Sequence, residues 1–156
     1  MQRYANSKAF VTLKDHKENF QSNTKCRLIN PAKSEMGLVS KQILEKINSQ
    51  IRCSTNLNQW RNTAAVIDWF KNIPDKSNSK FIKFDIVDFY PSISEELLGK
   101  ALEFAKKIVS ISDSDMKIIM NSRKSLLFDE NSIWCKKGDK LFDVTMGSYD
   151  GAEVYM

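Results

Sequence analysis

Phe84-Asp85-Ile86-Val87-Asp88-Phe89-Tyr90-Pro91-Ser92 is the stretch that decides how this sequence is interpreted. The run from Lys80 to Val87 is rich in β-branched and aromatic residues, which predicts a strand, and Pro91 ends it. Aspartate is depleted inside strands, yet Asp85 lies within this run. A partly buried carboxylate needs a cation or a set of hydrogen-bond donors to offset its loss of water. Asp85 is therefore the first candidate functional residue.

The predicted strand also sets the face to which the Asp85 side chain points. Strand alternation puts Ile82, Phe84 and Ile86 on one face and Asp85 on the other, near the strand end, where a ligand can reach it. The turn through 88–90 would expose backbone N–H groups and form a small anion-binding concavity. Two interpretations stay open: a carboxylate that holds a metal-chelated triphosphate, and an ordinary salt bridge to a basic side chain.

Upstream of this stretch, the sequence predicts two short strands and two helices. The strands cover 9–13 and 26–29, and a polar loop over 14–25 joins them. Helical spacing of apolar residues predicts a helix over 37–52. A second helix begins at Asn62 or Thr63, and we expect it to bury Val66, Ile67 and Phe70. The polar run over 75–80 predicts a loop.

Downstream, the sequence predicts two more helices and a hairpin. Residues 92–95 offer a capping box for a helix with Glu95 and Glu96 in its first turn. The stripe expected to be buried consists of Leu97, Ala101, Leu102, Ala105 and Ile108. Another helix runs from Ser112 to about Arg123, and a hairpin over 132–145 turns at 137–139. Strands mixed irregularly with helices predict an α+β fold.

Bulk properties narrow the protein class. The 156 residues suit one domain, and no stretch approaches the roughly 20 apolar residues that cross a bilayer. The first residues lack the apolar run of a signal peptide, so we expect an intracellular protein, cytoplasmic or nuclear, with no membrane partner. Residues 1–61 hold 11 Lys and Arg against 4 Asp and Glu, whereas residues 62–156 hold 13 against 15. A basic first third suits phosphate binding, although a solvated basic face gives the same asymmetry.

The cysteines and the histidine do not suggest a structural metal or disulfide framework. Cys26, Cys53 and Cys135 are odd in number and widely spaced, and His16 has no ligand partner nearby in sequence. We expect reduced structural thiols.

The central stretch resembles the first palm motif of reverse transcriptases, the RNA-directed DNA polymerases, in the form found in retroelements of the Penelope-like and non-LTR types. In that family the first aspartate ligates both catalytic metals, helped by the next carbonyl. The resemblance implies that Asp85 is catalytic and binds Mg²⁺ together with Ile86. It also implies that Tyr90 packs under the sugar and excludes a 2′-hydroxyl. The backbone of Asp88, Phe89 and Tyr90 would hold the incoming deoxynucleoside triphosphate.

The resemblance extends in both directions along the chain. Residues 13–17 and 26–30 resemble the fingers hairpin, which implies that Lys17 and Arg27, with Lys14 as a further candidate, clamp the triphosphate. The alternative for each of these residues is a solvated surface cation. Residues 144–152 resemble the Gly-x-x-x-Gly palm motif, which implies that Gly147, Asp150 and Gly151 lie against the template and the nascent base pair. Where the family usually has glutamine, this chain has Asp150.

The resemblance implies a partial right-hand polymerase fold, with residues 1–75 fingers-like and residues 76–156 an incomplete palm. The implied function is template-directed DNA synthesis by two-metal phosphoryl transfer, with an RNA or DNA template, a primer and deoxynucleoside triphosphates as partners. The family's aromatic-x-Asp-Asp motif occurs nowhere in the 156 residues, so we expect this chain to be inactive alone. Two alternatives are a non-enzymatic nucleic-acid-binding remnant of a retroelement and an interaction fragment in which Asp85 makes a simple salt bridge.

Overall fold

The computed structural model of the chain describes residues 10–15, 20–29, 33–57, 59–60, 62–87, 89–125, 127–129, 132–134, 141–144 and 146–155. It contains both helices and strands, as predicted for an α+β fold. In chain order the elements are β1 (Phe10–Leu13), β2 (Cys26–Ile29), α1 (Glu35–Thr55), α2 (Thr63–Lys71), α3 (Phe89–Ser92), α4 (Glu95–Ala105), α5 (Asp113–Ser122), β3 (Leu127–Asp129), β4 (Ser132–Trp134) and the 3₁₀ helix η1 (Ala152–Tyr155). In the part described, no helix is long and apolar enough to cross a membrane.

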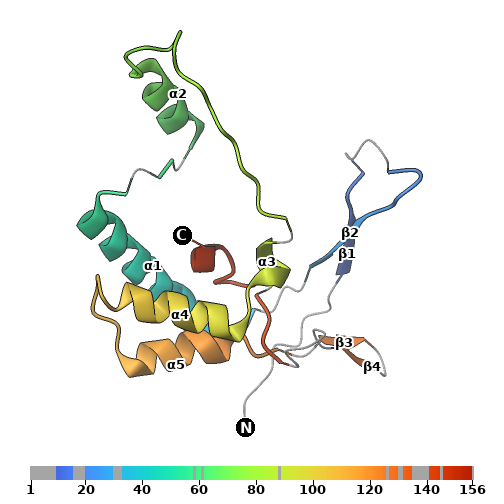
Figure 1. The fold of residues 1–156 in the computed structure, drawn as a ribbon. Coiled ribbons are helices and arrows are strands. Elements are labelled where there is room, and N and C mark those ends of the chain that lie inside the picture. Colours follow the sequence, from blue (N-terminus) through green and yellow to red (C-terminus); the bar gives the residue numbers. More distant parts are fainter. Residues whose placement is uncertain are drawn as a thin grey trace.

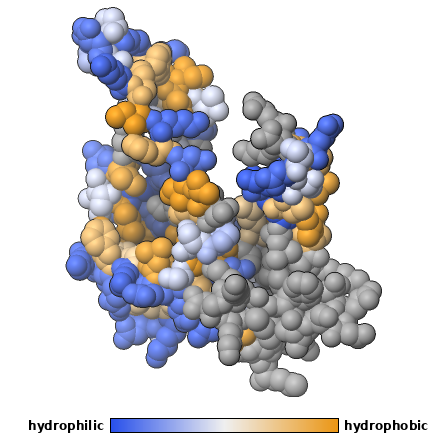
Figure 2. Space-filling view, turned by 45° about the vertical axis from the view of Figure 1, so that its right-hand side comes forward, coloured by the Kyte–Doolittle hydropathy of each residue, from blue (hydrophilic) through white to orange (hydrophobic). Residues whose placement is uncertain are grey.

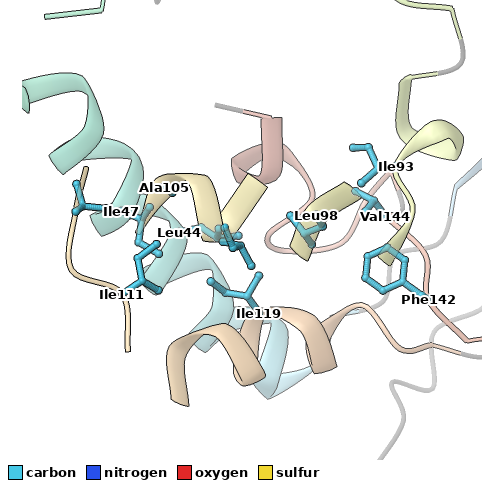
Figure 3. Packing of buried hydrophobic residues seen from close by; sticks show 11 residues of the cluster. Leu44, Ile47, Ile93, Leu98, Ala105, Ile111, Ile119, Phe142 and Val144 are labelled. Atoms are coloured by element: carbon cyan, nitrogen blue, oxygen red, sulfur yellow. The ribbon is translucent and has the colours of Figure 1, made fainter. Parts of the chain in front are cut away.

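The helices α1, α4 and α5 pack together with η1 and form the core, while α2 and the β1–β2 hairpin extend away from it (Figure 1). Figure 3 shows the buried side chains as one row, from Ile47 and Ile111 at one end, past Ile119, to Phe142 at the other. The buried apolar residues are Leu44, Ile47, Ile93, Leu98, Leu102, Ala105, Val109, Ile111, Ile119, Phe142 and Val144. Burial of these side chains is the main term that stabilises the fold.

Serine N-caps begin the three core helices, because each hydroxyl accepts a hydrogen bond from an otherwise unpaired backbone N–H. Ser34 accepts from Gly37 at 2.9 Å, Ser94 from Leu97 at 3.1 Å, and Ser112 from Asp115 at 3.1 Å. The predicted helices over 37–52 and 112–123 are confirmed, within a turn at their ends. The predicted capping box over 92–95 is wrong in detail, since Ser94 is the cap and the Ser92 hydroxyl donates to the Phe89 carbonyl.

The buried face of α4 differs from the predicted stripe. Leu102 and Ala105 are buried as expected, but Leu97 and Ala101 are exposed and Leu98 takes their place. The α4 sequence contains two adjacent stripes at helical spacing, one through residues 97, 101 and 104 and one through 98, 102 and 105. Both stripes are apolar, so spacing alone cannot choose between them. Packing on the core covers only the second.

The β1–β2 hairpin is confirmed, with antiparallel register Phe10↔Ile29 to Leu13↔Cys26. The backbone N–H of Lys14 extends the ladder by donating to the Lys25 carbonyl at 2.8 Å. The start of α2 is also confirmed, because Asn62 caps it by accepting from the Ala65 N–H at 2.9 Å. The loop predicted over 75–80 contains no helix or strand.

The predicted burial of Val66, Ile67 and Phe70 on α2 is wrong, because all three are exposed. The helix α2 stands away from α1, α4 and α5 (Figure 1), so no core surface covers these side chains. Its contacts with other described residues include those between the aromatic rings of Trp60 and Trp69 and of Phe70 and Phe81.

The strand predicted over 80–87 is also wrong: these residues form neither helix nor strand. The Phe84 side chain is 87 % exposed and that of Ile82 is 79 % exposed. A strand exists only when a neighbouring backbone completes its hydrogen bonds, and no described residue does so here. The residues have strand-forming character, but no described residue pairs with them.

The hairpin predicted over 132–145 has a different pairing. Strand β4 pairs with the preceding strand β3, in register Leu127↔Trp134 to Asp129↔Ser132. Residues 141–144 instead lie beside the end of α5, where Lys124 and Phe142 form a bridge and the Asp143 N–H donates to the Arg123 carbonyl. Burial of Phe142 and Val144 favours this placement. The predicted turn at 137–139 lies outside the described residues.

Candidate nucleotide and nucleic-acid site

Asp85 and Ile86, the predicted metal ligands, lie in the exposed segment between α2 and α3. Asp85 forms no ion pair or hydrogen bond with any described residue. The salt-bridge interpretation therefore finds no partner for Asp85 in the described part of the chain. A carboxylate in this position can approach a ligand without first leaving another side chain.

The aromatic residues Phe89 and Tyr90 follow Asp85 and form the one-turn helix α3. Their rings meet edge to face, with centroids 5.8 Å apart, and both are half-buried against the core. The turn is closed by two hydrogen bonds, from the Ser92 hydroxyl to the Phe89 carbonyl at 2.6 Å and from the Ile93 N–H to the Tyr90 carbonyl at 3.2 Å. Tyr90 is therefore held at the point where the exposed segment meets the core. Asp88 lies outside the described residues, so the predicted anion-binding concavity stays a prediction.

The basic candidates on the β1–β2 hairpin have different surroundings. Arg27 is exposed on β2, opposite Thr12. Lys14 is half-buried beside the end of β1, where its backbone pairs with Lys25. Lys17 lies outside the described residues. The hairpin and the segment that carries Asp85 rise from the same side of the core (Figure 1), and Figure 2 shows open space between the hairpin and the part of the molecule that carries α2.

Of the Gly-x-x-x-Gly candidates, Asp150 lies against α1 and the end of α5. Gly147 is exposed and has a φ of 100°, a left-handed conformation that favours glycine, whereas Gly151 is buried. The Asp150 carboxylate is 1 % exposed and forms an ion pair with the Arg123 guanidinium at 2.8 Å. The Ser122 hydroxyl donates to the same carboxylate at 3.0 Å, and the Arg123 guanidinium also donates to the Asp150 carbonyl at 3.0 Å. A template contact by Asp150 stays a prediction, and it would require this ion pair to open.

Arg123 is a residue that sequence reasoning missed. The sequence predicts it only as the end of a helix, and its separation of 27 positions from Asp150 gives no local signal of the pair. Burial lowers the pKa of Arg123 from its usual range, while the nearby Asp150 and Glu153 carboxylates oppose that shift. Glu153 in turn fixes η1 on α1, because its carbonyl accepts from the Asn48 side chain at 2.8 Å and its carboxylate lies 3.7 Å from Lys41.

The structure therefore distributes the described candidates over three places: the segment that carries Asp85, Ile86, Phe89 and Tyr90; the hairpin with Lys14 and Arg27; and the region of Gly147, Asp150 and Gly151. Asp85 and the Ile86 carbonyl are oxygen donors of the kind that Mg²⁺ prefers. They are a partial set, because a two-metal site needs further carboxylates, and no three His, Cys, Asp or Glu side chains converge within the described ranges. Cys26 and Cys53 are free thiols, and both are exposed rather than structural.

Comparisons of the chain with protein-family models, with curated proteins and with solved structures found no match.

Proposed function

We propose that this chain is the fingers and part of the palm of a reverse transcriptase domain, which in complete form would copy an RNA or DNA template from deoxynucleoside triphosphates. The observation that carries the proposal is the motif Phe84-Asp85-x-x-Asp88-Phe89-Tyr90-Pro91-Ser92, together with an Asp85 that is exposed and has no partner among the described residues. A structural aspartate in an apolar run would need a cation or donors. An aspartate that binds a metal-chelated substrate needs access instead.

Asp85 would act as a metal ligand, with help from the carbonyl of Ile86. Mg²⁺ bound there would neutralise charge that develops on the transferred phosphoryl group. The motif residues contribute the ligand, and the open segment leaves room for a triphosphate beside it. Further carboxylates must come from elsewhere, since these 156 residues contain no aromatic-x-Asp-Asp sequence.

Tyr90 would select deoxynucleotides by the position of its ring. A steric filter works only when the ring cannot move aside, and contact with Phe89 and the core restricts Tyr90. The hairpin cations would bind the triphosphate, and Arg27 suits this role because a guanidinium forms paired hydrogen bonds with phosphate oxygens.

A second candidate function is nucleic-acid binding without synthesis. It is favoured by the basic balance of residues 1–61 and because, in the described ranges, no three His, Cys, Asp or Glu side chains form a group that could hold a metal ion. This candidate requires the hairpin cations but not Asp85.

Primer extension separates the two candidates. The 156-residue chain should give no product with Mg²⁺ and deoxynucleotides, whereas the same chain joined to a palm segment that carries an aromatic-x-Asp-Asp hairpin should be active. In that fusion, Asp85→Asn removes the charge but keeps the shape, and synthesis should fall by orders of magnitude. The matched control is Asp68→Asn on α2, which is also exposed and should leave synthesis unchanged.

Each contrary outcome has a defined meaning. Full synthesis by the fusion with Asp85→Asn would refute the metal-ligand role. Binding of primer–template by an inactive fusion would support the second candidate. Extension by the 156-residue chain alone would show that its site holds more ligands than the sequence suggests.

A further inference from the structure

The segment Phe81–Val87 exposes an unusual amount of apolar surface. Its five apolar side chains, Phe81, Ile82, Phe84, Ile86 and Val87, are each more than half exposed. Its backbone N–H and C=O groups make no hydrogen bond to another described residue. Figure 1 shows the segment as an isolated trace between α2 and α3. An extended backbone that carries apolar side chains, and whose hydrogen-bonding groups have no partner in the described part of the chain, is a template for strand pairing with another chain.

The sequence of this segment is complementary to itself when two copies run antiparallel. With Phe84 opposite Phe84, Lys83 of each copy faces Asp85 of the other. Ile82 then faces Ile86, and Phe81 faces Val87. Opposite charges and pairs of apolar side chains directly across from each other stabilise an antiparallel ladder.

Other arrangements lose this match. A shift of two residues in one direction places Lys83 opposite Lys83, and a shift in the other direction places Asp85 opposite Asp85. A parallel pair in register opposes both like charges at once. Like charges directly opposite are destabilising, so charge selects one antiparallel register.

We propose that two copies of this chain associate through antiparallel pairing of their Phe81–Val87 segments, centred on Phe84. By strand alternation, Ile82, Phe84 and Ile86 form an apolar face of the paired ribbon, and the Lys83–Asp85 pairs lie on the other face. The inference does not rest on the proposed polymerase function, because it uses only charge, apolar surface and free backbone. It places Asp85 against Lys83 of the second copy, so Asp85 would be accessible to a metal ion only in the unpaired chain.

Charge reversal tests the register. Sedimentation velocity over a range of concentrations should show a monomer–dimer equilibrium for the unmodified chain. Lys83→Asp alone and Asp85→Lys alone each create like-charge pairs, and each should raise the dissociation constant about tenfold. The double variant K83D/D85K restores opposite charges and should recover the original constant. Lys46→Asp, an exposed charge reversal on α1, should change nothing.

A crosslink tests the centre of the pairing. With the three native cysteines replaced by serine, Phe84→Cys should form a disulfide-linked dimer on oxidation, because the two thiols lie directly opposite. Val87→Cys should not crosslink, because its counterpart lies at the far end of the ribbon. Phe84, Val87, Cys26 and Cys53 are exposed, so replacing them removes no described core side chain.

The proposal is overturned if the unmodified chain remains monomeric at every concentration. It is also overturned if the double charge reversal fails to restore dimers, or if Val87→Cys crosslinks as readily as Phe84→Cys. These outcomes concern association alone and leave the primer-extension test of the proposed function unaffected.

Discussion

Asp150 and Arg123 form an ion pair whose two side chains are each only 1 % exposed. Removing one partner leaves the other charge buried and without compensation, so Asp150→Asn should lower the free energy of unfolding by about 3–5 kcal/mol. Replacing both residues with apolar ones of similar size, as in R123M/D150L, should cost less than the single change. Urea unfolding gives the free energy of unfolding of the unmodified chain, of Asp150→Asn and of R123M/D150L. A single variant that is as stable as the original would show that the pair contributes little.

Replacement by alanine should lower the free energy of unfolding at Ser94 but not at Ser40. The Ser94 hydroxyl caps α4, so Ser94→Ala should lower the free energy of unfolding by about 1 kcal/mol. The Ser40 hydroxyl is fully buried and has no hydrogen-bond partner among the described residues, so Ser40→Ala should leave stability unchanged or raise it. Thermal unfolding of the two variants gives the comparison. A large loss in Ser40→Ala would mean that this hydroxyl has a partner.

Residue-level prediction from the sequence succeeded where the cause is local. The starts of α2 at Asn62 or Thr63 and of α5 at Ser112 are predicted correctly, because a helix start depends on a capping residue and the backbone three positions later. The partner of Asp150 was not predictable, because Arg123 reaches it through the packing of the whole core. The exposure of Asp85 was not predictable either, because it depends on how distant parts of the chain pack.

Among the elements, α2 lies outside the core that α1, α4 and α5 form. Phe81 is 5.8 Å from Phe70 and 6.2 Å from Trp69, between ring centroids, and these contacts link α2 to the exposed segment. Phe81→Ala should therefore speed hydrogen exchange of the α2 amides about tenfold, with α1, α4 and α5 unaffected.

The control for this prediction is Phe104→Ala, which removes an equally exposed ring from α4. It should leave exchange in α2 unchanged. If Phe81→Ala instead weakens protection throughout the molecule, α2 and the core unfold as one unit.

Strand prediction failed at this scale for a physical reason. Residues 80–87 and 132–145 have strand-forming side chains, but a strand also needs a neighbour that no local pattern identifies. For the β1–β2 hairpin, the partner is the next apolar run along the chain, so the pairing was predicted. For 132–134, the sequence predicted pairing with the run that follows, up to residue 145. In the structure the partner is the preceding run, 127–129.

At the scale of the whole molecule, the charge distribution predicts how binding depends on salt. Residues 1–61 carry the positive balance, so affinity for primer–template should fall steeply with salt, with a slope of about 0.9 per phosphate contact in a log–log plot. Lys14→Gln together with Arg27→Gln should reduce that slope. Fluorescence anisotropy over a salt series measures it.

The matched control is Lys100→Gln with Lys107→Gln, which removes the same charge from exposed positions at α4 and just beyond its end. If both double variants reduced the salt slope equally, binding would depend on net charge rather than on the cations of the hairpin.

The contact between α1 and η1 joins parts of the chain made at very different times. Asn48 and the Glu153 carbonyl that it binds are 105 residues apart. On the ribosome, α1 therefore emerges long before the residues that cover it, and Leu44 and Ile47 stay exposed during most of synthesis. The core helices can pack on α1 only after translation has passed α5, which ends at Ser122, and η1 joins last. Until α5 is made, the apolar face of α1 is open to binding by a chaperone.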